Sequence, residues 1–130
     1  MRPWPVLLFA AGLLLACGGR DMADDATLRA DIQGGRAGAE VTFDGVLQAD
    51  PVRSGTHEHL VVLAGSGDVL EIDHNVSLAT WVPAHQGDQV VVRGQLYLDP
   101  GHPGVHCTHA HTSSGCPQSG WIEYGGSYYE

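Results

Sequence analysis

Residues 89–98 read QVVVRGQLYL, and this stretch decides the fold. Apolar and polar side chains alternate along it, which is the pattern of a β-strand whose two faces lie in different surroundings. The apolar side chains on one face are Val90, Val92, Leu96 and Leu98, and the polar ones on the other are Gln89, Arg93 and Gln95. The sequence therefore predicts a strand with one face in a core.

The same alternation recurs on both sides of this stretch. Four further strands are predicted, at residues 41–47, 57–64, 69–74 and 105–109. Turn residues such as Gly65-Ser66-Gly67 separate them, and residues 77–82 are a candidate helical turn ended by Pro83. Three strands, a short helix and two more strands predict an all-β domain, a small five-stranded OB-like Greek-key barrel. A β-sandwich fragment is the alternative.

The two ends of the mature chain differ in character. Residues 121–129 (WIEYGGSYY) predict a C-terminal hairpin, because Gly-Gly suits a two-residue turn between strands. Residues 17–39 are rich in Gly, Ala and Asp and have few large apolar side chains. A short helix from Asp24 to Gln33 is plausible there, ended by Gly34-Gly35. We otherwise expect residues 17–39 to be a flexible tether, and residues 40–130 to form the barrel domain.

The first 16 residues have the features of a secretory signal peptide. A basic start precedes the apolar run at residues 6–15, which is too short to span a bilayer. The junction Leu14-Leu15-Ala16-Cys17 resembles the lipobox of bacterial lipoproteins, in which the cysteine is acylated and becomes the first mature residue. The resemblance implies an envelope protein anchored to membrane lipid through Cys17. Gly18 is similar to the pattern of outer-membrane lipoproteins, on the periplasmic face or the cell surface.

Charge and cysteines narrow the expectations further. The mature chain carries 15 acidic residues against five arginines, a net charge of −10. This disfavours nucleic acid as a partner, because phosphate binding draws its affinity from Lys and Arg. Cys107 and Cys116 remain after Cys17 is assigned to the anchor. An exported protein favours a disulfide between them. Metal ligation beside the neighbouring histidines is the alternative.

All eight histidines lie between positions 57 and 111. Residues two apart on a strand share a face, so His57 with His59, and His109 with His111, could each offer two imidazoles to one ion. Imidazole ligands suit Zn²⁺, Cu²⁺ or Ni²⁺. The candidate metal ligands are His57, His106 and His109, although His106 and His109 share a face only if the chain turns between them. His74 is either a hydrogen-bonded buried residue or a site residue, and His85 and His102 are expected at the surface.

Three short motifs resemble a family of short exported bacterial proteins of uncharacterised function, which has a His-Trp-Thr-His motif. The motifs are His74-Asn75, His106-Cys107-Thr108-His109 and Gly120-Trp121-Ile122, and the likeness covers residues 41–129 in order. Cys107 departs from the pattern, because it replaces the tryptophan. The resemblance implies an OB-like fold and a set of candidate functional residues, but no reaction. These candidates are His57 or His59, His74, Asn75, His106, Thr108, His109 and Trp121.

Three functions follow as hypotheses. The first is a tethered binding module whose His-rich site holds a transition metal, such as Zn, or a small ligand. The second is a metal-dependent hydrolase of the phosphodiesterase or nuclease kind, in which a His-bound metal activates water. The third is a structural envelope protein whose polar motif fixes a loop. We rank binding first because no carboxylate-histidine spacing matches a catalytic template, so whether the protein is an enzyme stays open.

Overall fold

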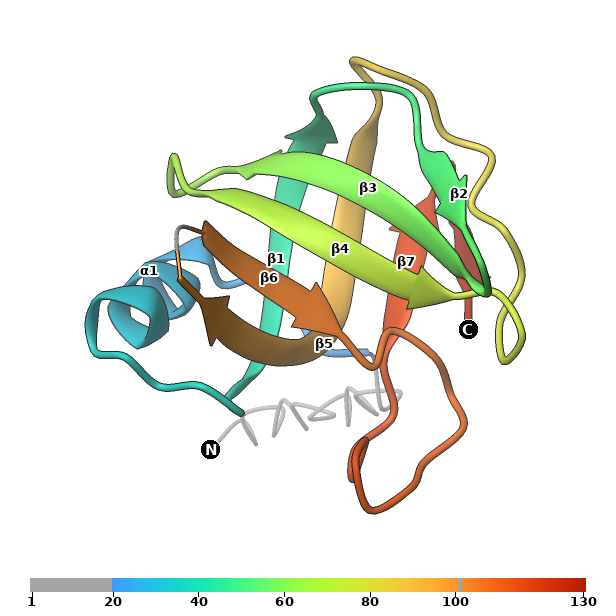
Figure 1. Cartoon of the computed structure of the whole chain (residues 1–130). Coiled ribbons are helices and arrows are strands. Elements are labelled where there is room, and N and C mark those ends of the chain that lie inside the picture. Colours follow the sequence, from blue (N-terminus) through green and yellow to red (C-terminus); the bar gives the residue numbers. More distant parts are fainter. Residues whose placement is uncertain (1–19, 101) are drawn as a thin grey trace, which may run out of the picture.

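The structure, a computed structural model, describes residues 20–100 and 102–130 (Figure 1). The predicted signal peptide and Cys17 lie outside these residues. The elements, in chain order, are α1 (Asp25–Gln33), β1 (Glu40–Leu47), β2 (Val52–Ser54), β3 (His57–Ala64), β4 (Val69–Asn75), β5 (Gln89–Asp99), β6 (His102–His106), β7 (Trp121–Tyr124) and β8 (Ser127–Tyr129). Within these residues no helix is long and apolar enough to cross a bilayer.

Five of the strands close into a barrel. Their order is β1, β3, β4, β6, β5, and β5 pairs back with β1 through seven residue pairs from Glu40–Gln95 to Val46–Gln89. The β4–β6 pairing is parallel and the other pairings around the barrel are antiparallel. This is the predicted small OB-like barrel, and its closure excludes the β-sandwich alternative because the five strands leave no open edge.

The barrel is filled by the faces that the alternation predicts. Val90, Val92 and Leu96 of β5 are at most 1% exposed, whereas Leu98, near the end of the strand, is only partly buried. The side chains that share this core from the other strands include Val41, Phe43, Leu47, Leu60, Val62, Leu70, Ile72, Val105 and Ile122. Their burial removes apolar surface from water, which is the main stabilising contribution in a domain of this size.

Two predicted elements differ from the structure. Residues 77–82 form no helix: Asn75 accepts hydrogen bonds from the backbone N–H and the hydroxyl of Ser77, which makes a single turn, and the chain then continues without regular structure. The strand expected at residues 105–109 instead spans His102–His106. It ends there because Cys107 has a φ of 59°, which an extended strand does not allow.

Helix α1 forms where the sequence suggests, but it is not part of a flexible tether. Asp24 caps it, because its carboxylate accepts a hydrogen bond from the Thr27 backbone N–H at 3.0 Å. Leu28 is 0% exposed and belongs to the barrel core. The folded domain therefore starts well before residue 40, and the tether predicted at residues 17–39 is wrong for α1. Leu28, together with the partly buried Ile32, packs the helix against the barrel.

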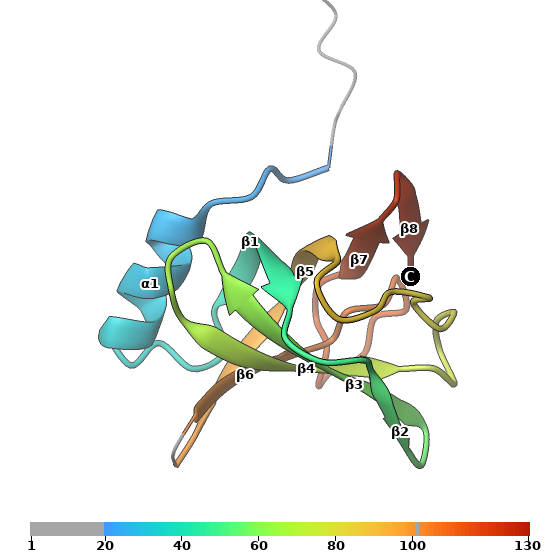
Figure 2. The ribbon, with the colours of Figure 1, turned by 90° about the horizontal axis from the view of Figure 1, so that it is seen from above.

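The C-terminal hairpin forms as predicted. Strands β7 and β8 pair across Gly125 and Gly126, whose φ values of 58° and 81° are those a two-residue turn of this kind requires. Strand β7 also pairs with β5, so the hairpin extends the barrel wall on that side. Figure 2 shows β7 and β8 on one side of the molecule and β2, β3, β4 and β6 on the other.

Candidate functional site

A polar pocket of about 360 Å³ lies on the outer face of β3, β4, β5 and β6. Buried and partly exposed positions alternate along β3 and β4, so every second side chain faces outward, on the side of the pocket. The hairpin of β3 and β4 sets His59 opposite Asp73, two register positions from His57 opposite Asn75, so both pairs lie on the same face. The side chains that line the pocket are His57, His59, Glu71, Asp73, Tyr97, Asp99 and His106.

His59, Glu71 and Asp73 converge at the centre of this pocket. Their ligand atoms all lie within 4.8 Å of one another. His59 Nδ1 is 2.6 Å from Asp73 Oδ1 and 3.1 Å from Glu71 Oε1. His59 Nδ1 and Asp73 Oδ1 are buried atoms without a hydrogen-bond partner among the described residues, so their short contact is a close approach of the two groups and not a hydrogen bond. Such atoms are costly unless something binds them.

Tyr97 fixes the orientation of Asp73. Its ring crosses β6 at Gly104, where an added Cβ would lie 2.1 Å from Tyr97 Cζ. Because Gly104 has no side chain, the Tyr97 ring fits over it and the tyrosine hydroxyl donates to Asp73 Oδ2 at 2.7 Å. Burial, and then this bond to a carboxylate, raise the pKa of Tyr97 well above its ordinary value. The outer carboxylate oxygen, Oδ1, therefore stays turned toward His59.

Two further histidines line the same pocket. His57 shares the outward face of β3, and its ring centroid is 6.2 Å from that of His59. His106 lies at the end of β6, where its Nε2 is 2.8 Å from Gln95 Oε1 on β5. Burial lowers the pKa of His106, and the Asp73 charge only partly offsets this, so the imidazole is neutral at pH 7. If Nε2 donates to Gln95, Nδ1 keeps a free lone pair.

His102 lies at the rim of this pocket. Its Nε2 is 3.1 Å from Glu71 Oε2, and just over half of its side chain is exposed. The surface position agrees with the prediction. The contact with Glu71 was not expected, because it depends on the pairing of β6 beside β4.

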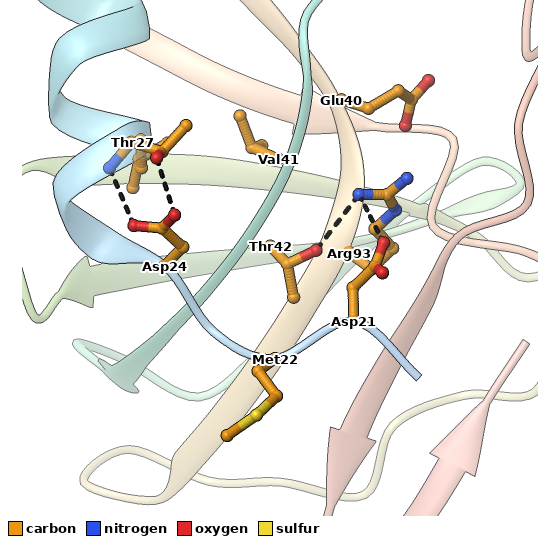
Figure 3. Close-up of a pocket in the computed structure, with 9 residues that line it drawn as sticks. Asp21, Met22, Asp24, Thr27, Glu40, Val41, Thr42 and Arg93 are labelled. Atoms are coloured by element: carbon orange, nitrogen blue, oxygen red, sulfur yellow. Dashed lines mark hydrogen bonds and ion pairs between the residues drawn. The ribbon is translucent and has the colours of Figure 1, made fainter. Parts of the chain in front are cut away.

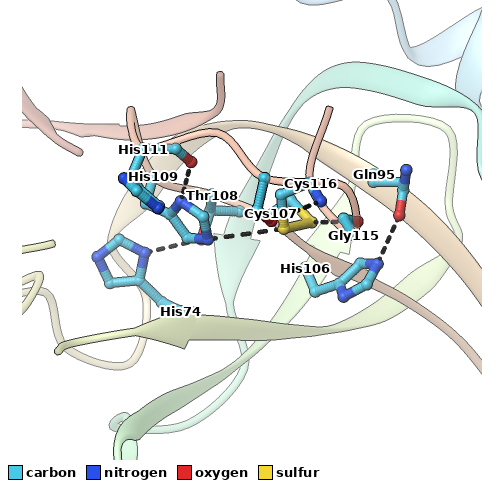
Figure 4. The surroundings of a disulfide bond; sticks show 10 residues. His74, Gln95, His106, Cys107, Thr108, His109, His111, Gly115 and Cys116 are labelled. Atoms are coloured by element: carbon cyan, nitrogen blue, oxygen red, sulfur yellow. Dashed lines mark hydrogen bonds between the residues drawn. A yellow bond between two sulfur atoms is a disulfide. The ribbon is translucent and has the colours of Figure 1, made fainter. Parts of the chain in front are cut away.

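His74 is a buried, fully bonded residue and lies away from this pocket. Its Nδ1 is 2.7 Å from the Thr108 hydroxyl (Figure 4). Its Nε2 is 2.9 Å from the Thr80 carbonyl oxygen. Because a carbonyl only accepts, Nε2 carries the proton and Nδ1 accepts from Thr108. Burial lowers the pKa of His74 and keeps it neutral. His74 and Thr108 thus hold a loop, and Asn75 caps the turn that starts it.

Glu58 faces the barrel interior opposite His74 and is 0% exposed. Its Oε1 accepts a hydrogen bond from the Val82 backbone N–H at 2.8 Å, while Oε2 has no hydrogen-bond partner in the described chain. Burial raises the pKa of Glu58 to about 7, and the bond from Val82 offsets only part of this. Glu58 and His74 together clamp the loop between β4 and β5 at Thr80 and Val82.

Cys107 and Cys116 form the predicted disulfide (Figure 4). His109, only 5% exposed, lies inside the loop that it closes. Its Nδ1 donates to the His111 carbonyl oxygen at 2.7 Å, and its Nε2 lies 3.7 Å from Cys116 Sγ. Gly120 lets the returning chain pass, because a Cβ there would lie 2.0 Å from the Cys107 carbonyl oxygen. His109 is thus held in a packed loop.

The structure therefore divides the predicted residues among several places. His57 and His106 of the proposed metal set lie in one pocket, while His109 does not line it. Trp121 is 6% exposed on the C-terminal hairpin and packs edge-on against Tyr128. His85 is exposed beside Asp50. Among the described residues the group with metal-ligand spacing is His59, Glu71 and Asp73.

Sequence reasoning did not single out Glu71 and Asp73 as ligands, although it predicted the strand at residues 69–74 that carries them. A signal was available. A hairpin centred on Gly65-Ser66-Gly67 pairs residues equally distant from Ser66, and this rule alone sets His59 opposite Asp73.

A scan against protein-family models and a search of curated proteins both found no match. The roles of these residues are therefore argued from their own geometry.

Proposed function

We propose that the mature chain is a lipid-anchored envelope module that binds a divalent transition metal ion at His59, Glu71 and Asp73. The observation that carries the proposal is the convergence of three ligand atoms within 4.8 Å of one another, of which His59 Nδ1 and Asp73 Oδ1 are buried and make no hydrogen bond among the described residues. A metal ion bound by all three would satisfy these atoms once they move slightly apart. The histidine-rich binding module expected from the sequence is thereby given specific ligands, two of them carboxylates.

The donor set fits this class of ion. One imidazole nitrogen with two carboxylate oxygens suits Zn²⁺ and its neighbours better than Ca²⁺ or Mg²⁺, which prefer oxygen alone. Zinc bonds of roughly 2.0–2.2 Å place tetrahedral ligands about 3.3 Å apart, so His59 and the carboxylates need only small movements. Tyr97 acts as the outer partner that orients a ligating carboxylate. His57, His106 or water would complete the coordination.

Calorimetric titration of Zn²⁺ into the untagged mature protein tests the metal site. We expect one ion per chain, and at least a tenfold rise in Kd in His59→Ala and in Asp73→Asn. His85→Ala is the matched control, because His85 also contacts a carboxylate but lies outside the pocket. The proposal is refuted if the wild type does not bind Zn²⁺, or if the pocket variants bind as tightly as the control.

The lipid anchor has a separate test. Acylation of Cys17 predicts that the wild-type chain fractionates with membranes and that Cys17→Ser is released in soluble, folded form. A Cys17→Ser variant that stays with the membrane would refute the anchor and leave the metal site unaffected.

A hydrolase is a second candidate because of one observation. His106 lines the same pocket, and its bond to Gln95 leaves a ring nitrogen free to accept a proton from a metal-bound water. Zn²⁺-loaded protein would then release nitrophenol from bis-nitrophenyl phosphate, and His106→Ala would lose this activity while still binding Zn²⁺. If the loaded wild type releases none above the Zn²⁺ blank, this candidate is rejected and the binding module stands.

A further inference from the structure

The segment just before α1 is docked on the C-terminal hairpin. The Arg20 guanidinium forms an ion pair with the Glu130 carboxylate, with one N–O distance of 2.9 Å. The same group lies over two aromatic rings, 3.8 Å from the centroid of Tyr128 and 5.8 Å from that of Trp121. Cation–π contact and ion pairing therefore act on one side chain and hold Arg20 at the hairpin.

The next residues are held as well. Asp21 pairs with Arg93 of β5 at 3.0 Å, and the same guanidinium donates to the Thr42 hydroxyl of β1 (Figure 3). The Asp24 backbone N–H donates to the Thr42 carbonyl oxygen at 2.8 Å. Residues 20–24 thus follow one path over β1 and β5 into the packed helix α1, so the connection from barrel to anchor is docked from Arg20 onward.

This docked segment and the metal pocket lie on opposite sides of the barrel. Arg20 contacts β7 and β8, which Figure 2 shows on the side away from β3, β4 and β6. The pocket opens on the outer face of β3, β4 and β6 and on the end of β5 at Tyr97 and Asp99, whereas Asp21 contacts β5 nearer its start, at Arg93. A chain fixed at Arg20 therefore presents two different faces, one beside the anchor and one away from it.

We propose that the surface formed by Arg20, Tyr128 and Glu130 rests on the membrane surface and that the metal pocket faces away from it. This orientation rests on the lipid anchor of the proposed function. Cys17 precedes Arg20 by three residues, which span at most about 11 Å. Tyr128 is 40% exposed there, and the amphipathic ring of a tyrosine suits the headgroup region. Neighbouring acidic side chains, Asp21, Glu123 and Glu130, favour a zwitterionic rather than an anionic lipid surface.

Relaxation measurements on the acylated full-length protein test this orientation. The protein is placed in phosphatidylcholine nanodiscs that contain a gadolinium-chelating lipid, and the broadening of amide signals is recorded by NMR. Because broadening falls steeply with distance from the bilayer, residues 121–129 should broaden several-fold more than residues 52–60 of β2 and β3. Equal broadening of the two regions, or more at residues 52–60, would overturn the proposal.

Variants show whether docking of residues 20–24 sets the orientation of the domain on the membrane. Arg20→Ala combined with Asp21→Ala removes the contacts of these two side chains with the barrel and the hairpin. The broadening at residues 121–129 and at residues 52–60 should then become similar. Arg53→Ala, which removes an exposed arginine from β2, is the control and should keep the wild-type pattern. If the double variant keeps it too, docking does not set the orientation. Wild-type protein that does not incorporate refutes the anchor itself, and the Zn²⁺ titration is unaffected by either result.

Discussion

Replacing Glu58 with glutamine should remove a large part of the pH dependence of stability. The folded-state pKa of Glu58 is raised to about 7 from an ordinary 4.5, because the carboxyl is fully buried. The native state therefore holds this proton more tightly than the unfolded chain. The free energy of unfolding falls as pH rises from 4.5 to 7 and is flat above that. At 1.36 kcal/mol per pKa unit, the loss is roughly 3 kcal/mol.

The side chain introduced by Glu58→Gln cannot ionise, but it keeps an oxygen that accepts from the Val82 N–H. Urea unfolding of both proteins between pH 4.5 and 8 measures the effect, because every other titrating group cancels in the difference. That difference should shift by roughly 3 kcal/mol in favour of the Glu58→Gln variant across this range. At the acidic end the wild type should be the more stable, since the added N–H₂ is buried without a partner. A difference that does not change with pH would refute the buried, proton-holding carboxyl.

Three further changes test other parts of the structure. Leu28→Ala should lower the free energy of unfolding by about 2–5 kcal/mol, because it leaves a cavity in the core, whereas a residue in a flexible tether would show no loss in denaturant unfolding. Gly104→Ala should displace Tyr97 at little cost in stability, and absorbance titration at alkaline pH should then show the Tyr97 pKa falling toward its ordinary value. Reduction of the Cys107–Cys116 disulfide should cost about 2–3 kcal/mol in thermal or urea unfolding, as loop-closure entropy predicts for so short a loop, and no loss would show that the loop is fixed without it.

The barrel was predictable because its pattern is local. Alternation in β3, β4 and β5 sets which side chains point inward, and one closed topology buries all of these faces at once. Residues 77–82 show where local pattern fails. Their apolar spacing suggests a helical turn, but Glu58 on β3 and His74 on β4 bind the backbone at Val82 and Thr80 and hold this stretch open. Side chains of two strands, one of them 24 residues away, decided its conformation.

Helix α1 was underestimated for a related reason. Its composition is polar, and the mean hydropathy of the segment gives no sign that Leu28 lies in the core and that Ile32 packs against it. The prediction of the pocket residues was incomplete for a third reason. Tyr97 contacts Asp73 across an intervening strand, and that contact depends on the parallel pairing of β4 with β6 and on the absence of a side chain at Gly104. Neither feature can be obtained from the spacing of residues along one strand.

The His-Cys-Thr-His run shows why residue type alone could not assign a role. Cys107, with its φ of 59°, turns the chain in the middle of the run and sends its members to three environments. His106 lines the outer pocket, Thr108 donates to His74 inside the barrel, and His109 is held within the disulfide loop. Strand alternation likewise separates His57 and His59, which face outward, from Glu58 between them, which faces inward. On a closed barrel, the face of the wall that carries a polar residue decides its role. An outward-facing histidine can bind an ion, whereas an inward-facing one makes hydrogen bonds that stabilise the fold.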